Sequence, residues 1–341
     1  MTEFSWRLPG HGDARRAGKQ ANRAAFDDVL QIVDAAELAG LDGVVAPFDP
    51  EGFESWVVSG AALRATRHLA VNVEFEPTFG SPVYAAKVST TLQRLSHGRL
   101  SWRLAAVDVS TDQHDLHAEK YRRAEEFLTV ARAVWNEEPV GGDGFEGTGV
   151  DYDGEFFHVA NGGFRGILSG VPFPTVHTSG HDSRALELSA RLGDVHIFSE
   201  RAHGIGDSVR ALQDATGVTG RHVRVGIEIP VIARETDSEA WARVERLAGQ
   251  AGADLLGASD LGDARWTGFR HLGFDLPIGL VGSYQTVAER LREYVTDGVS
   301  DIVLTGRPHI EEVHRLGEHV LHLVDPVGRV PHPSLLEEVS V

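Results

Sequence analysis

Apolar residues recur along this chain in two alternating patterns, one typical of amphipathic helices and the other of short buried strands. Residues 285–298 carry apolar side chains at helical spacing, and residues 300–306 form a short apolar run that ends at a glycine. This order of helix and buried strand recurs along most of the chain, as in parallel sheets whose strands are joined by crossover helices. The pattern therefore predicts the α/β class.

Eight strand–helix units fit the sequence. The predicted strands are residues 4–8, 43–46, 68–75, 100–107, 175–177, 195–198, 223–233 and 300–306. The predicted helices are residues 25–39, 54–65, 82–95, 119–136, 183–192, 205–216, 237–250 and 285–298, followed by a terminal helix at 309–324. A TIM (β/α)8 barrel has this organisation and carries its functional residues just beyond the C-terminal ends of its strands. We expect a single barrel domain over residues 1–341.

Three segments interrupt the alternation. Residues 108–118 form a predicted loop, and residues 141–160 read as a small hairpin within an insertion around residues 137–172. Residues 251–282 are glycine-rich and predicted to be irregular. Asp237 is the expected cap of the helix that precedes this last segment.

Composition narrows the class of protein. The 341 residues are 42% hydrophobic, contain no cysteine and carry a formal charge of −18. The missing cysteines exclude disulfides, thiol nucleophiles and iron–sulfur clusters, and the acidity argues against a nucleic-acid partner. No apolar run approaches the length of a membrane span, and no secretory signal precedes the first strand, so we expect no membrane partner and a cytoplasmic location.

Histidine-rich strings are the first candidates for chemistry, since the GxSxG, GxxxxGK[ST] and HExxH motifs are all missing. His114 and His117 have a spacing that metal sites use, but their polar surroundings favour a solvated loop. His309 and His314 are five residues apart and share a helix face poorly. We expect no metal site.

The Thr-Ser-Gly-His-Asp-Ser string at residues 178–183 is the better candidate, because it follows a strand and opens a helix. The free N–H groups and positive dipole end of a helix N-terminus suit a phosphate. Ser179, Gly180 and Ser183 are the predicted phosphate-binding residues. Ordinary N-capping by Asp182 or Ser179 is the alternative.

The sequence resembles the bacterial luciferase-like superfamily over nearly its whole length, and most closely the alkanesulfonate monooxygenases of that superfamily. The matching segments are residues 4–13, 36–47, 81–99, 117–135, 152–159, 185–197, 223–241 and 305–318. The resemblance implies a TIM-like barrel with insertions that forms homodimers or homotetramers. It also implies reduced FMN from a separate flavin reductase, or the deazaflavin F420 in one branch; the FMN members react with O2 to give a flavin peroxide that oxygenates a small-molecule substrate.

Positions carried over from the resemblance give further roles. Ser179, Gly180 and Ser183 would hold the flavin phosphate, and Tyr121 would lie by the ribityl chain or the isoalloxazine. His11 would lie on the active face and act as a catalytic acid or base, with local backbone capping as its alternative. Arg103 stands where the family approaches the flavin with an asparagine.

Departures from the sulfonate enzymes are equally informative. Glu228 and Pro230 replace an arginine and a histidine on the seventh strand, and Glu76 replaces an arginine on the third. Gly52 stands in place of a cysteine, and Arg307 in place of a tyrosine.

Val107 and Asp108 replace small residues near the flavin, and the mobile lid of that family is shortened to residues 251–282.

The exchange of arginine for glutamate argues against a sulfonate substrate, because an arginine guanidinium binds the oxygens of such an anion with two parallel hydrogen bonds. Glu76 and Asp108 would bind the substrate and Glu228 would take part in catalysis, which favours an amine. Arg307 would stabilise developing negative charge. Alternatively, the carboxylates pair with Arg103 and Arg307 in a closed salt-bridge network.

Three functions remain open at this stage. The first is a two-component, reduced-FMN-dependent monooxygenase acting on a small non-sulfonate substrate, with an amine as one candidate. The second is an F420-dependent oxidoreductase, which needs no water-excluding lid. The third is a catalytically silent luciferase-like subunit or binding protein.

Overall fold

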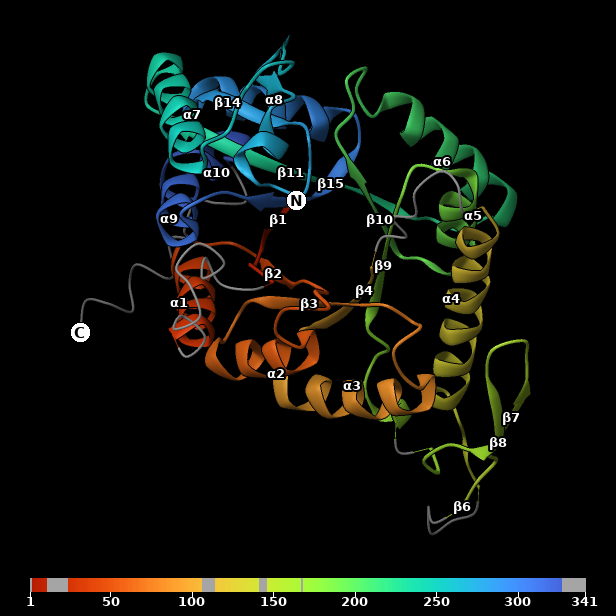
Figure 1. Cartoon of the computed structure of the whole chain (residues 1–341). Helices are drawn as coiled ribbons and strands as arrows, with labels where there is room; N and C mark the ends of the chain where they lie inside the picture. The colour runs from red at the N-terminus through yellow and green to blue at the C-terminus, as the bar shows by residue number, and fades with distance from the viewer. Residues whose placement is uncertain (1, 11–23, 106–113, 141–145, 167, 327–341) are drawn as a thin grey trace.

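Parallel strands surrounded by helices form the centre of the computed structural model, which describes residues 2–10, 24–105, 114–140, 146–166 and 168–326 (Figure 1). Within these residues, eight parallel strands close into a barrel in the order β1, β2, β3, β4, β9, β10, β11, β15, and β15 pairs with β1. The barrel strands are β1 (Glu3–Arg7), β2 (Gly43–Ala46), β3 (Ala70–Phe75), β4 (Leu100–Leu104), β9 (Thr175–Ser179), β10 (Val195–Ser199), β11 (Arg224–Arg234) and β15 (Val299–Thr305). The predicted TIM barrel is confirmed.

Helices pack around the outside of the barrel. They are α1 (Ala24–Leu38), α2 (Ser55–Ala65), α3 (Pro82–Ser96), α4 (His114–Trp135), α5 (Ser183–Leu192), α6 (Gly206–Thr219), α7 (Asp237–Ala251), α8 (Tyr284–Thr296), α9 (His309–His319) and α10 (Leu321–Val324). Helix α4 begins at His114, so the predicted loop over residues 108–118 was too long. The predicted terminal helix is divided at Val320 into α9 and α10.

Two short antiparallel pairs follow α4. Strands β5 (Pro139–Val140) and β6 (Glu146–Gly147) form one pair, and β7 (Val150–Asp153) and β8 (His158–Gly162) form the other. The second pair confirms the predicted hairpin. A short 3-10 helix, η3 (Leu168–Gly170), then leads back to β9.

Residues 251–282 contain more structure than the sequence pattern predicted. Strands β12 (Asp260–Gly262), β13 (Arg265–Trp266) and β14 (Gly279–Ser283) extend the sheet beyond the barrel, with the 3-10 helix η4 (Phe269–Leu272) between β13 and β14. Strand β14 pairs in parallel with the last residues of the long strand β11, from Val231 onward. Because β14 is only five residues long and contains two glycines, its apolar signal is weak.

The core lies between the outer face of the barrel and the helices. Phe4 and Trp6 on β1 are fully buried against this layer, whereas the alternate residues of the strand face the interior of the barrel. Thr236 rather than Asp237 caps α7, where it forms a capping box with Glu239. The same alternation that buries apolar residues outside the barrel aims the polar residues of its strands inward, toward the site described next.

Candidate functional site

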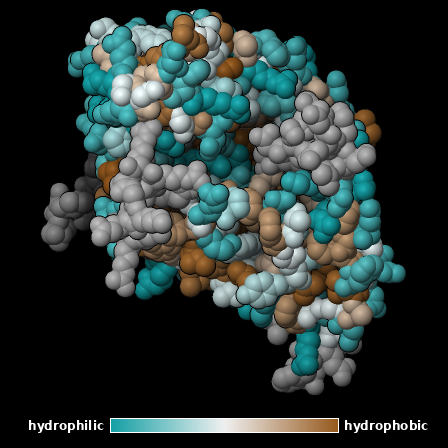
Figure 2. All heavy atoms as spheres, viewed as in Figure 1, coloured by the Kyte–Doolittle hydropathy of each residue, from teal (hydrophilic) through white to brown (hydrophobic). Residues whose placement is uncertain are grey.

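A cavity of about 670 Å³ opens at the C-terminal ends of the barrel strands, the face at which TIM barrels carry their functional residues. It is lined by residues that follow β1 and β2, by residues of β11 and β15, and by residues 273–276 beyond η4. Its charged and polar lining residues include Arg7, Asp49, Glu51, Glu228, Asp275, Thr305, Arg307 and His309. Figure 2 shows hydrophilic side chains gathered around a hollow near the middle of one face of the molecule.

Four charged side chains form a buried network at the base of this cavity. Arg7 on β1 lies 2.7 Å from Glu74 on β3 and 3.3 Å from Glu228 on β11. Arg103 on β4 completes the network with a close ion pair to Glu228. The two positive and two negative charges cancel, so the network is formally neutral.

At Glu228 and Arg7, ion pairing shifts the pKa of the side chain more than burial does. Burial favours the neutral form of Glu228, but Arg103 and Arg7 hold the pKa of its carboxyl below the usual value. Burial likewise acts to lower the pKa of Arg7, yet Glu228 and Glu74 raise it above the usual value. Both groups therefore stay ionised near neutral pH.

This network differs in two members from the paired-carboxylate alternative that the sequence left open, because Glu74 stands in place of Glu76 and Arg7 in place of Arg307. Glu228 pairs with Arg103 as expected, but its second partner is Arg7 and not Arg307. Arg307 instead places its guanidinium 5.0 Å from the centre of the Phe274 ring. Among the described residues, the structure records no ion pair for that guanidinium, and Arg307 lines the cavity.

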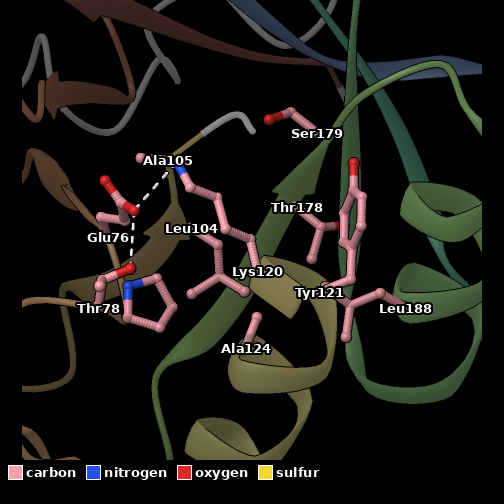
Figure 3. Close-up of a pocket in the computed structure, with 11 residues that line it drawn as sticks. Glu76, Thr78, Leu104, Ala105, Lys120, Tyr121, Ala124, Thr178, Ser179 and Leu188 are labelled. Atoms are coloured by element: carbon pink, nitrogen blue, oxygen red, sulfur yellow. Dashed lines mark hydrogen bonds and ion pairs between the residues drawn. The ribbon is translucent and has the colours of Figure 1, made fainter. Parts of the chain in front are cut away.

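A second, smaller pocket of about 30 Å³ lies at the ends of β3, β4 and β9 (Figure 3). Lys120 reaches across it from α4 and lies 3.3 Å from Glu76, which also accepts a hydrogen bond from Thr78. Tyr121 and Ser179 line the same pocket. The structure thus brings Glu76, Tyr121 and Ser179 together, but it places Glu228 and Arg307 in the larger cavity.

The N-terminus of α5 borders this pocket and is capped by Asp182. One carboxylate oxygen of Asp182 accepts hydrogen bonds from the backbone N–H groups of Arg184 and Ala185, at 3.0 and 3.1 Å. The other oxygen accepts a 2.9 Å hydrogen bond from the Tyr121 hydroxyl. Ser183, the first residue of the helix, is exposed. The N-capping alternative is what the structure shows.

A flavin phosphate does not fit this arrangement. The N–H groups of Arg184 and Ala185 and the Tyr121 hydroxyl are donors that a phosphate here would use, and they already bind the Asp182 carboxylate. A phosphate would also bring like charge against that carboxylate. The assignment of Ser179, Gly180 and Ser183 to a phosphate stays a prediction, and the hydrogen bonds of Asp182 argue against it.

Two predicted site residues, His11 and Asp108, lie outside the described residues, and their roles stay predictions. Sequence reasoning missed Arg7 and Glu74, although both are charged residues inside predicted strands whose neighbours are apolar. That signal marks a side chain that faces the barrel interior, whereas Arg103 and Glu228 were predicted from positions carried over from the resemblance.

No helix in the part of the chain that the structure describes is long and apolar enough to span a membrane.

Solved structures with the same fold cover almost the whole chain. EDTA monooxygenase from Chelativorans sp. BNC1 is 17% identical with a TM-score of 0.73, over 97% of this chain and 95% of that one.

A long-chain alkane monooxygenase is 17% identical with a TM-score of 0.67, over 97% of both chains. An F420-dependent secondary alcohol dehydrogenase is 15% identical with a TM-score of 0.68, over 95% of this chain and 99% of that one. At these identities the likeness shows the fold alone. The sequence model of luciferase-like monooxygenases matches residues 2–301, and the chain therefore belongs to the luciferase-like monooxygenase family.

Proposed function

We propose that this chain is a flavin-dependent monooxygenase that acts with O2 on a small non-sulfonate organic substrate and takes its reduced flavin from a separate reductase. Membership of the family supports the reaction class. The observation that carries the proposal is the cavity of about 670 Å³ at the C-terminal ends of the strands, which is large enough for a small organic molecule. We expect a homodimer or homotetramer.

Arg307 favours a substrate with an oxygen acceptor, and the acidic lining residues disfavour an anion. Glu228 and Glu76, on which the expectation of an amine rested, are paired with arginines and a lysine respectively. Arg307 offers a guanidinium held against Phe274, and a guanidinium donates readily to carbonyl or hydroxyl oxygens. Asp49 and Asp275 also line the cavity and disfavour a strongly anionic molecule such as a sulfonate.

The buried network prepares the base of this cavity. It ties together the ends of four strands, β1, β3, β4 and β11, through side chains that are nearly excluded from water. Its charges cancel, and its members are held by each other. In this proposal Arg307 orients the substrate, and the network keeps the base of the cavity rigid.

A catalytically silent barrel is the second candidate, favoured by one specific observation. The polar groups that could serve a cofactor or substrate, at Asp182 and at Glu228, are satisfied by neighbours in the chain itself. Hydride transfer with F420 is a further alternative, because F420-dependent enzymes share the fold.

A coupled turnover assay tests the proposal. The protein would be mixed with a flavin reductase, NADH, flavin and panels of neutral oxygen-containing molecules and amines under 18O2. Substrate-dependent incorporation of 18O that falls in the Arg307→Ala variant is the expected result. Flavin binding without any oxygenated product from either panel would contradict the proposal, and reduction of F420 by an alcohol would replace it with hydride transfer.

A further inference from the structure

The Asp182 carboxylate caps the N-terminus of α5 and also makes a hydrogen bond that a simple helix cap does not. Its carboxylate accepts from two backbone N–H groups and from the Tyr121 hydroxyl, so that each of its oxygens has a partner. Tyr121 is 8% exposed, and burial together with the bond to Asp182 raises the pKa of its hydroxyl above the usual value. The hydroxyl therefore stays protonated and continues to donate.

The backbone beside this carboxylate is fixed in place. Gly180 has a φ of +130°, and a Cβ there would lie 2.7 Å from the Ala185 Cβ and 3.5 Å from the Tyr121 hydroxyl oxygen. The Gly180 carbonyl accepts a 2.9 Å hydrogen bond from Nε2 of His196, whose Nδ1 accepts from Ser189 at 2.6 Å. Burial lowers the pKa of His196 to about 4, so this histidine is neutral and its tautomer is defined by the two bonds.

The lysine that reaches into the pocket is not available to an additional anion. Lys120, the cation on the pocket side, is already paired with Glu76 at 3.3 Å. Ser179 has a shielded hydroxyl for which the structure gives no partner among the described residues. A hydroxyl of this kind can bind a neutral hydroxyl group of a ligand as well as it can bind an anion.

We infer that the Asp182 carboxylate takes the place of a ligand phosphate at the N-terminus of α5, so that this site selects a flavin without a phosphate. The inference rests on the proposed use of a flavin, and it names the form: a riboflavin-type molecule whose side chain ends in a hydroxyl. In this arrangement Asp182 is a specificity-determining residue. It holds the donors that a phosphate would use, and it repels the phosphate through its charge.

Flavin selectivity tests the inference. Dissociation constants for riboflavin and FMN would be measured on the full chain by fluorescence quenching. Asp182→Ser keeps a small capping hydroxyl and removes the charge, and Asp182→Asn keeps the volume and the cap. Glu54→Gln is the matched control, because Glu54 is an exposed carboxylate that caps the separate helix α2 through the Val57 N–H at 3.0 Å.

Wild type and Glu54→Gln are expected to bind riboflavin at least as tightly as FMN. Asp182→Ser is expected to shift the preference toward FMN by at least about tenfold, with Asp182→Asn in between. Wild-type protein that binds FMN tenfold more tightly than riboflavin would overturn the inference while it supports the use of flavin. An unchanged preference in both Asp182 variants would overturn it as well.

If no form of the protein binds a flavin, the effect of inorganic phosphate on the melting temperature tests the role of Asp182 separately from the proposed function. A phosphate-dependent rise in melting temperature in Asp182→Ser, absent from wild type and from Glu54→Gln, would support the role of Asp182 and refute the use of flavin. No phosphate-dependent rise in Asp182→Ser would overturn the inference itself.

Discussion

Neutralising Glu228 is expected to destabilise the barrel strongly. Glu228→Gln keeps the shape of the side chain but removes the charge that Arg7 and Arg103 share. Removing one partner of a buried ion pair costs about 3–5 kcal/mol. Arg7 keeps Glu74, so most of the loss falls on Arg103, whose Nε and Nη1 groups have no hydrogen-bond partner among the described residues.

The size of the effect on the melting temperature follows from the length of the chain. At about 2.1 cal/mol/K per residue, unfolding of 341 residues has an entropy of about 0.7 kcal/mol/K. A loss of about 3–5 kcal/mol therefore lowers the melting temperature by about 4–7 °C. Differential scanning calorimetry at pH 7 measures this shift directly.

A surface pair is the control for this substitution. Arg122 and Glu155 are 3.0 Å apart but 52% and 53% exposed, so Glu155→Gln should change the melting temperature by less than about 1 °C. A melting temperature of Glu228→Gln that stays as close as this to wild type would refute the reasoning, because it would mean that Arg103 does not depend on this carboxylate.

Three further predictions concern pH, the backbone and the substrate. Burial, Arg103 and Arg224 lower the pKa of His177 from 6.5 to about 3, so the folded state keeps it neutral and stability falls as the pH drops below 6.5. Between pH 6.5 and 5 this loss is about 2 kcal/mol, and His177→Gln should lose that much less than wild type in denaturant titrations. Gly180→Ala should cost about 1–3 kcal/mol in the same titrations because of its positive φ and its contact with Ala185, whereas Gly249→Ala in α7, which meets nothing within 4 Å, should not destabilise. Arg307→Ala should raise the KM for the substrate at least about tenfold with little change in melting temperature, and an unchanged KM would remove Arg307 from substrate binding.

The barrel could be predicted from the sequence because its signals are local and repeated. Each barrel strand is a short apolar run, and each following helix shows an apolar stripe, so eight units were found with small errors at their ends. Strand β14 was missed because it lies in a glycine-rich run with a weak apolar pattern. Its pairing with the end of β11 is a long-range contact that the local sequence does not show.

The site could be predicted only in part. Arg103 and Glu228 were recognised as buried charges, but which carboxylate meets which arginine depends on the register of strands far apart in the sequence. Their partner Arg7 comes from the first strand, beside the last one in the closed barrel. At the N-terminus of α5, the string at residues 178–183 fits both a phosphate and a carboxylate cap, and the hydrogen bonds of Asp182 to α5 and to Tyr121 on α4 distinguish the two.

Anaerobic titration of the full chain with reduced riboflavin and reduced FMN, followed by admission of O2, tests the proposed function most directly. The account predicts saturable binding of a reduced flavin, with riboflavin bound at least as tightly as FMN. It also predicts uptake of O2 that yields an oxygenated product when a substrate is present. Failure of both reduced flavins to bind would contradict the central claim and leave a luciferase-like barrel without flavin chemistry.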